Sequence, residues 1–245
     1  MNAKAITLCA SAAGEVAQQL TSGATSSSFG FQIDIQLSPV DLDEIKRKHS
    51  VMYSSTDNSF LSATTSLLTD MVGNPFKGIA LSAALQASAF SSDTSKPVLE
   101  RFDLDMDQEL GVLTLYFAET ADPTTLDVTG LTLQQKFNAT LDAQHTLRQA
   151  TVTTAENSAN VTVILSRQDF DALKIKRIAS TAQTVWLGVR EGAINDTSGI
   201  GVAELVNGVN VIPCGNFTDD KIHPHIEHFD LNMNEGLSAL MRGGG

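Results

Sequence analysis

The feature that most constrains the fold of this chain is an internal repeat. Residues 33–46 and residues 161–174 carry the same order of apolar, serine and acidic positions. Residues 96–106 and 223–233 share a second pattern, in which proline, glutamate, Phe-Asp-Leu and methionine occupy matching places. The period of about 127 residues is longer than most solenoid repeats and has the size of a whole β-sandwich domain. We therefore expect tandem domains along the chain.

The repeat is out of phase with residue 1. Residues 6–8 correspond to residues 131–133, so the first unit lacks the part that corresponds to 97–130. Three parts are predicted: residues 1–95 as an immunoglobulin-like repeat without its opening strands, residues 96–222 as a complete repeat, and residues 223–245 as the opening strands of a third repeat and a candidate donor strand.

Each unit is predicted to be a series of short strands. Phe102, Leu104 and Met106 alternate with acidic residues, and a second alternating segment follows Gly111 and runs to Phe117. Such alternation on both sides of a turn predicts a hairpin with one buried face. We therefore expect an all-β fold of tandem immunoglobulin-like sandwiches with about seven strands each. The other predicted strands are 129–135, 147–153, 160–165, 184–190 and 207–213.

One short helix is expected in each repeat. Segments 41–46 and 169–174 each carry two apolar residues three positions apart, which lie on one face of a helix. Asp41 or Asp169 stands before them and is a suitable N-cap. The helix is expected to connect the two sheets of the sandwich.

Charge and composition exclude several function classes. Lys and Arg total 16 against 28 Asp and Glu, which gives a net charge of −12. This charge repels phosphate backbones and anionic lipid, so nucleic acid is not an expected partner. No segment approaches the roughly 18 consecutive apolar residues of a membrane span. Cys9 and Cys214 are too few for a disulfide framework and leave the redox compartment open.

Several segments resemble a known class of repeat. Residues 111–123, with 129–134 after them, are similar to the opening of immunoglobulin-like repeats in bacterial S-layer-type surface proteins and in very large secreted proteins of algae and other protists. Residues 70–74 resemble the Asp-x-x-Gly-Asn turn of those repeats, and residues 196–200 keep its Asp and Gly. The resemblance implies an extracellular or cell-surface location and a structural or adhesive role. It carries over no catalytic residue.

Four Asn-x-Thr triplets are candidates for N-linked glycosylation, since this triplet is the acceptor for N-linked glycans. A Thr-rich sequence also produces such triplets by chance. The one at Asn160 is the weakest candidate because it opens a predicted strand, whereas those at Asn195 and Asn216 lie in turn-like sequence. The candidates are Asn138, Asn160, Asn195 and Asn216.

Four carboxylates of the complete repeat offer oxygen ligands of the kind that Ca²⁺ binds. They are Asp103, Asp105, Asp107 and Glu109. Their spacing of two also points side chains to solvent from a strand whose other face is buried, and this interpretation needs no ion. Structural calcium is the one cofactor that the residues suggest.

Three histidines, His223, His225 and His228, lie close together and can in principle bind a transition metal. On a strand His228 would face away from the other two, and the counterparts of all three one repeat earlier are not metal ligands. A solvated linker is the preferred interpretation. Because no phosphate loop, Ser-His-Asp motif or CxxC occurs, we expect no catalytic residues and no enzymatic activity.

The incomplete repeats lead to a hypothesis of assembly. A sandwich without two of its strands exposes an apolar groove and unpaired backbone groups. Phe229, Leu231, Met233 and Leu237, near residue 245, belong to a further copy of the missing hairpin. Strand sharing with other copies of the protein, or with continuing repeats of a longer chain, would pair the open groove of the first repeat with the extra hairpin near residue 245. Head-to-tail contacts of this kind give a filament. The alternative function is an adhesin module whose loops at one sandwich end bind glycan or protein ligands.

Overall fold

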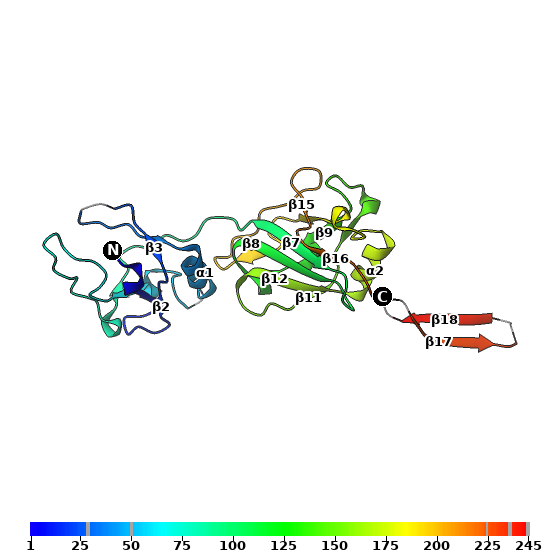
Figure 1. The fold of residues 1–245 in the computed structure, drawn as a ribbon, viewed down its shortest axis with the longest axis horizontal. Coiled ribbons are helices and arrows are strands. Elements are labelled where there is room, and N and C mark those ends of the chain that lie inside the picture. Colours follow the sequence, from blue (N-terminus) through cyan, green and yellow to red (C-terminus); the bar gives the residue numbers. More distant parts are fainter. Residues whose placement is uncertain (28–29, 50, 224, 235–236, 244–245) are drawn as a thin grey trace.

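The computed structural model has three parts in a row: an N-terminal part, a central sandwich and a C-terminal hairpin (Figure 1). It describes residues 1–27, 30–49, 51–223, 225–234 and 237–243, with the backbone alone for 225–228 and 237–243. In these residues strands predominate, and there are two α-helices. The fold is therefore mostly β, as the alternation of apolar residues predicts.

The central sandwich consists of two sheets. One has the strand order β10-β9-β13-β15, and the other has the order β11-β12-β8-β7-β16, with β14 paired to β8. The pair β16–β7 is parallel, and the other pairs are antiparallel. The strands are β7 (Leu99–Asp105), β8 (Val112–Asp122), β9 (Leu131–Gln134), β10 (Gln144–Thr146), β11 (Ala150–Val152), β12 (Ser158–Leu165), β13 (Trp186–Val189), β14 (Asn195–Asp196), β15 (Ile212–Pro213) and β16 (Phe217–Thr218).

The core of the sandwich forms because inward residues of both sheets are large and apolar. Phe102 and Leu113 from one sheet, and Leu133 and Leu187 from the other, are fully buried in a single cluster. In β7, Asp103 is polar and more exposed than Phe102 and Leu104 on either side of it. This is the period-two pattern of a strand with one buried face.

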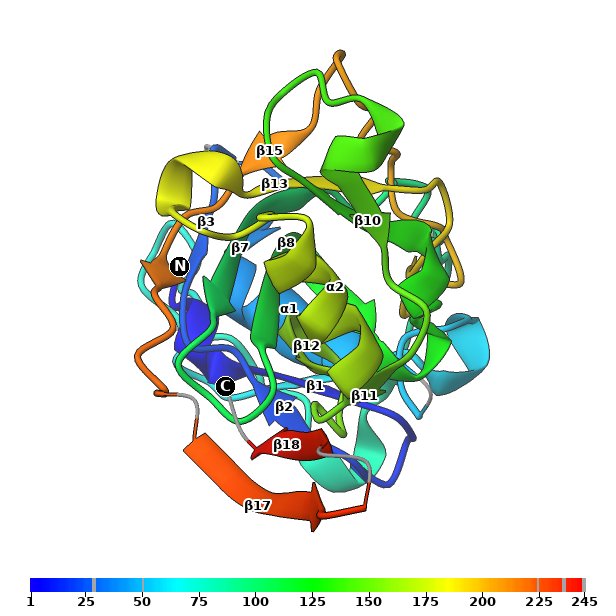
Figure 2. The same cartoon turned by 90° about the vertical axis from the view of Figure 1, so that its right-hand side faces the viewer.

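The helix α2 (Arg167–Ile175) lies across the end of the sandwich that faces the hairpin (Figure 2). Phe170 and Leu173 are fully buried in the core cluster that both sheets share. The helix therefore closes this end of the sandwich, and its two apolar residues pack between the sheets.

The first turn of each helix differs from the prediction. Ser38 and Ser166 are the N-caps, and each hydroxyl accepts a hydrogen bond of 3.1 Å from the amide three residues further on. Asp41 and Asp169, the predicted caps, lie inside the first turn. Both carboxylates are buried and accept hydrogen bonds from loop amides instead. Serine is a good N-cap for the same reason as aspartate, so residue type alone did not distinguish them.

Some strands are shorter than predicted. Segments 129–135 and 184–190 contain β9 and β13, and 147–153 contains β11, with β10 just before it, whereas β12 begins two residues before the predicted 160–165. Segment 207–213 keeps only β15, because residues 207–210 form a turn in which the Asn210 side chain bonds the backbone of Glu204 and Val206.

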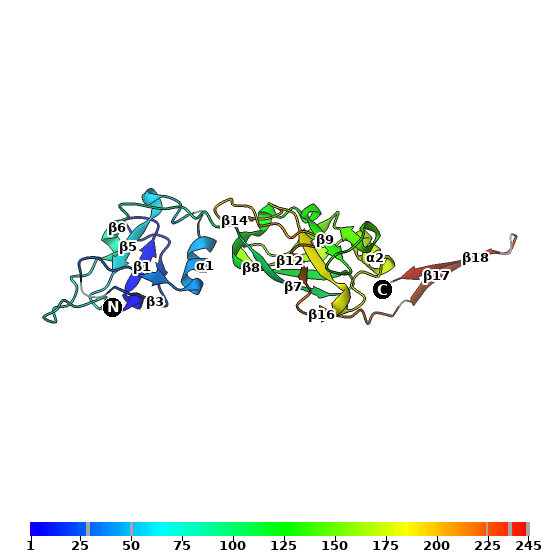
Figure 3. The ribbon, with the colours of Figure 1, turned by 90° about the horizontal axis from the view of Figure 1, so that it is seen from above.

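The N-terminal part has a four-stranded sheet, β2-β1-β5-β6, and a separate pair, β3–β4. Its core cluster is small and consists of Ile6, Leu8, Leu20, Ile45 and Met52. The helix α1 (Pro39–Arg47) lies at the end that faces the sandwich (Figure 3). The strands are β1 (Ile6–Cys9), β2 (Gln18–Gln19), β3 (Gly23–Ala24), β4 (Gln36–Leu37), β5 (Phe60–Ala63) and β6 (Leu85–Gln86), and the chain's 3-10 helices are Ala3–Ala5, Thr56–Asn58, Leu81–Ala83, Pro123–Thr125, Val128–Gly130, Leu141–Ala143 and Ala182–Thr184.

The N-terminal sheet has the same pairing as one sheet of the sandwich. Leu8 pairs with Leu61 across β1 and β5, and the residues that correspond to them in the repeat, Leu133 and Leu187, pair across β9 and β13. The next pairs, β5–β6 and β13–β15, match in the same register. The six-stranded sheet of the sandwich has only β3–β4 as its equivalent among the described residues of the N-terminal part.

Candidate assembly interface

The C-terminal hairpin has the same strand pairing as β7–β8 of the sandwich. β17 (His225–Asn232) and β18 (Leu237–Gly243) form a two-stranded sheet that extends beyond the sandwich (Figure 1). Phe229 pairs with Leu240 as Phe102 pairs with Leu115. In both hairpins a register shift lies two residues before the phenylalanine. β17–β18 therefore has the same central pairing and the same irregularity as β7–β8, although four residues connect its strands and six connect β7 to β8.

The apolar face of β17 is exposed. Phe229, Leu231 and Met233 are 63%, 58% and 80% exposed. Their counterparts Phe102, Leu104 and Met106 are at most 1% exposed. Full burial of a side chain of this size is worth roughly 1.5–3 kcal/mol. The hairpin thus has the apolar residues of a sandwich strand without the rest of the sandwich. Leu237 begins β18, and its side chain is outside the described residues.

The N-terminal part has the matching gap. Among the described residues β4 pairs with β3 and with no other strand, whereas its counterpart β12 lies between β11 and β8. Ile33, just before β4, is 38% exposed, whereas its counterpart Val161 is fully buried and pairs with β8. Leu42 of α1 is also exposed. Its counterpart in α2, Phe170, is buried and contacts Gly111, the residue just before β8. Both exposed residues therefore lack the counterpart of β8.

The N-terminal part also has a hollow of about 320 Å³ beside β1, β5 and β6. Leu8, Leu61, Leu85 and Ala87 are among the residues that line it. In the sandwich the corresponding positions are part of the core or pack against it: Leu133, Leu187, Ile212 and Cys214. The residues that line the hollow therefore correspond to core residues of the sandwich, but they are covered by fewer apolar side chains.

The N-terminal part also lacks a counterpart of the β16–β7 pair among its described residues. In the sandwich β16 pairs in parallel with β7, with Phe217 opposite Leu104. Phe90, which corresponds to Phe217, lies in a segment, 89–98, that has no regular structure. Among the described residues of the N-terminal part, no strand occupies the place of β7 beside Phe90.

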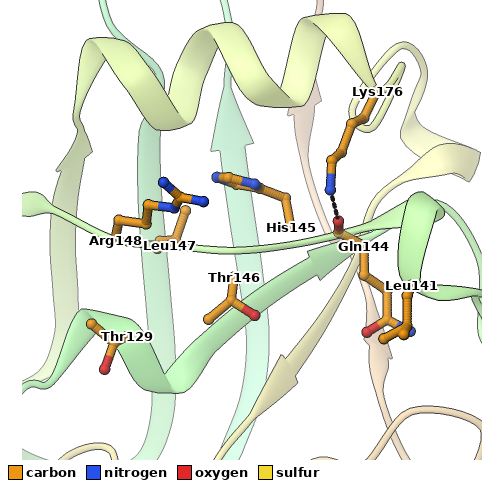
Figure 4. A pocket seen from close by; sticks show the side chains of 8 residues that line it. All are labelled: Thr129, Leu141, Gln144, His145, Thr146, Leu147, Arg148 and Lys176. Carbon is orange, nitrogen blue, oxygen red and sulfur yellow. Dashed lines mark hydrogen bonds between the residues drawn. The ribbon is translucent and has the colours of Figure 1, made fainter.

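A second hollow, of about 510 Å³, lies beside β10 and the end of α2 (Figure 4). His145 donates to or accepts from the buried carboxylate of Asp169 at 2.7 Å, and the Lys176 ammonium donates to the Gln144 carbonyl at 2.6 Å. Burial alone would raise the pKa of Asp169, but hydrogen bonds, first from the Gln149 amide, lower it below its usual value. These polar groups already form hydrogen bonds with one another, so their role at this hollow is structural.

Comparisons with known protein families, curated proteins and solved structures found no match to this chain. In addition, no described helix is long and apolar enough to cross a bilayer. A proposal of function therefore depends on the exposed hairpin and on the gap in the N-terminal part.

The four carboxylates considered for calcium do not converge. Asp103 accepts hydrogen bonds from the backbone and side chain of Asn216, and Asp105 accepts from the Asp107 amide. Asp107 accepts from the Lys221 amide, and Glu109 is exposed. In the described residues these oxygens serve turns and loops and do not gather around one point.

The glycosylation candidates differ in access. Asn138 and Asn160 are exposed, the latter on β12, and Asn195 is half-buried in β14. Asn216 is exposed, but its amide donates to Asp103 at 3.1 Å. Asn138 is thus the candidate in an exposed loop whose side-chain amide is not engaged by a carboxylate.

The histidine and cysteine candidates form no site in the described residues. His223 is exposed, and the side chains of His225 and His228 lie outside the described part of the structure. Cys9 is buried and Cys214 is half-buried, and both are free thiols.

Proposed function

We propose that this chain is a structural subunit of an extracellular filament, assembled head to tail by strand sharing between tandem immunoglobulin-like repeats. The hairpin β17–β18 of one copy fills the gap in the N-terminal part of the next. The observation that carries the proposal is the shared register of β17–β18 and β7–β8, including the register shift at the same position. A hairpin that already has this register can add to an N-terminal part whose described residues lack the two strands corresponding to β7 and β8.

The repeat defines the contacts of the joined interface. Val161 of β12 pairs with Leu115 of β8, so in the joined interface Ile33 of one copy is opposite Leu240 of another. Phe217 pairs with Leu104, so Phe90 is opposite Leu231. Phe229 and Leu231 then enter the hollow of the N-terminal part. Strand addition of this kind combines main-chain hydrogen bonds with pockets for alternate side chains.

The positions of the two surfaces favour a filament. The hairpin and the N-terminal part lie at opposite ends of the elongated molecule (Figure 1). The contact is heterologous, because two different surfaces meet, and such contacts propagate unless their rotation closes a ring. The extracellular location is supported by the resemblance to surface-protein repeats and by the exposed triplet at Asn138.

Disulfide trapping tests the proposed register. In a Cys9→Ala, Cys214→Ala background, Ile33→Cys with Leu240→Cys should give a ladder of crosslinked oligomers under mild oxidation. Asp34→Cys with Leu240→Cys is the matched control, since a shift of one residue places the side chain on the other face. It should crosslink much less.

Light scattering tests the assembly itself. The whole chain should grow in mass with concentration, and the chain shortened to residues 1–222 should remain a monomer. A whole chain that stays a compact monomer at all concentrations, with no crosslinked ladder, would overturn the proposal.

A further inference from the structure

Three carboxylates meet where the N-terminal part joins the sandwich. Asp93 lies in the connecting segment, Glu119 on β8 and Asp196 on β14. Each offers a carboxylate oxygen, and these oxygens lie within 4.8 Å of one another. Lys46 of α1 bonds Asp93 at 2.6 Å and also contacts Glu119. Three negative charges thus face one positive charge at this junction.

The carboxylate of Asp196 is buried and only half satisfied. Its exposure is 2%. One oxygen, Oδ1, accepts hydrogen bonds of 2.8 and 2.7 Å from the amides of Ser198 and Ile200. The other, Oδ2, has no partner among the described residues, and neither does the buried hydroxyl of the adjacent Thr197. A buried charge with a free oxygen is costly unless a proton or a cation compensates it.

The repeat shows why this oxygen is free. Asp70 forms the same turn 126 residues earlier, and its Oδ1 accepts from the amides of Val72 and Asn74. There Oδ2 also accepts a hydrogen bond of 2.8 Å from the Asn74 side chain. Ile200 stands in place of Asn74 in the second turn, so the internal donor is lost while the carboxylate becomes buried.

The Lys46–Asp93 pair by itself is a repeated structural element. Lys174 and Asp220 correspond to these two residues and bond at 2.8 Å. The described residues around that second pair include no third carboxylate within metal-binding distance. Among the described residues, the additional oxygens of Glu119 and Asp196 thus occur at the first lysine–aspartate pair and not at the second.

We propose that Asp93, Glu119 and Asp196 form a calcium-binding site that ties the N-terminal part to the sandwich. The ligands are all oxygens, they come from three separate segments, and no described histidine or cysteine belongs to the group. Ca²⁺ accepts six to eight oxygens in irregular geometry, whereas Mg²⁺ requires near-octahedral geometry. The Thr197 hydroxyl supplies a neutral oxygen next to Asp196, and water completes the shell.

Lys46 competes with the ion. Its ammonium bonds two of the three carboxylates, so Ca²⁺ must displace it at least in part. Burial raises the pKa of Glu119 and repulsion from Asp93 and Asp196 adds to this, although Lys46 acts in the opposite direction. One lysine does not fully neutralise the group. The affinity is accordingly expected in the range of about 10⁻⁴ to 10⁻³ M, typical of extracellular calcium modules.

Calorimetric titration of the whole chain, first treated with a chelator, tests the site. CaCl₂ should bind with a stoichiometry of one and raise the melting temperature, and MgCl₂ should do so at least tenfold more weakly. Asp196→Asn should abolish both calcium effects. The matched control is Asp70→Asn, in the equivalent exposed turn, which should keep them. No calcium binding by the wild-type chain, or unchanged binding by Asp196→Asn, overturns the proposal.

A second variant separates a calcium site from a simple ion-pair network. Lys46→Met removes the competing ammonium, so calcium should bind several-fold more tightly than to the wild type. Lys174→Met breaks the equivalent pair and should leave the calcium affinity unchanged. If Lys46→Met binds calcium no better than the wild type, the carboxylates serve the lysine alone and the proposal is wrong.

Discussion

Asp41 accepts hydrogen bonds of 2.9 and 3.1 Å from the backbone amide of Thr21, so α1 holds the segment between β2 and β3 in place. The corresponding pair in the sandwich is Asp169 and Arg148, at 3.2 and 3.1 Å. Both carboxylates are buried. The same anchor between a helix and a loop therefore occurs in both parts, and its role is structural.

The first prediction concerns this anchor. Asp169→Ala leaves the amides of Arg148 and Gln149 without their acceptor, and a lost hydrogen bond to a charged group costs about 1.5–3 kcal/mol. We expect a loss of about 3 kcal/mol in the free energy of unfolding, measured with urea. Asp169→Asn keeps one acceptor oxygen and should lose less. Glu109→Ala, at an exposed position, should change stability by less than about 0.5 kcal/mol.

The second prediction concerns the pH dependence of stability at the junction. Burial alone would raise the pKa of Asp93, but Lys46 and the Ser95 amide lower it from 3.8 to about 2. Because the folded pKa is below the unfolded one, the ionised carboxylate stabilises the fold above pH 4, and this contribution is lost as the pH falls toward 2. The difference in unfolding free energy between the wild type and Asp93→Asn should therefore shrink over that range. A difference that stays constant in acid would contradict the ion pair.

The third prediction concerns the thiols. Burial raises the pKa of Cys214 to about 11 and also raises that of Cys9. Since the thiolate is the reactive form, both should react slowly with a disulfide reagent in the native chain at pH near 8. Two equivalents should react rapidly in guanidinium chloride, and one in Cys214→Ser. Fast reaction of both thiols in the folded chain would show that they are accessible.

The fourth prediction compares two corresponding phenylalanines. Phe229→Asp should abolish the growth of oligomers in light scattering and leave the melting temperature of the sandwich unchanged, because this side chain is outside the sandwich core. Phe102→Ala removes a fully buried ring and should destabilise the sandwich by about 3–5 kcal/mol. Equal loss of stability in both variants would mean that the hairpin packs on its own chain.

The fifth prediction combines the two ends of the interface. Ile33→Asp should damage the groove and Phe229→Asp the hairpin, so each variant alone should remain a monomer. Mixed in equal amounts, they should form heterodimers and stop there, because each pair has one intact groove and one intact hairpin. Sedimentation of the mixture measures this. Long oligomers in the mixture would point to a different contact.

The sequence predicted the elements whose signal is local. Alternation at Phe102, Leu104 and Met106 correctly indicated a strand with one buried face: Phe102 and Leu104 lie in β7, and Met106, also buried, follows it directly. The apolar pair Phe170 and Leu173 correctly indicated a short helix. The cap was assigned to aspartate because both serine and aspartate suit that position, and only the contacts of the carboxylate show which one is used.

By itself, the sequence determined that the chain is mostly β with short helices, because side chains that alternate with period two, or lie three positions apart, can be recognised without knowing where the chain goes. Only the tertiary structure decided that Lys46, Asp93, Glu119 and Asp196 meet at one junction. These residues lie on four separate segments, and their distances depend on how α1 packs against β8. No local pattern records that packing, since it arises from contacts between residues far apart in the chain.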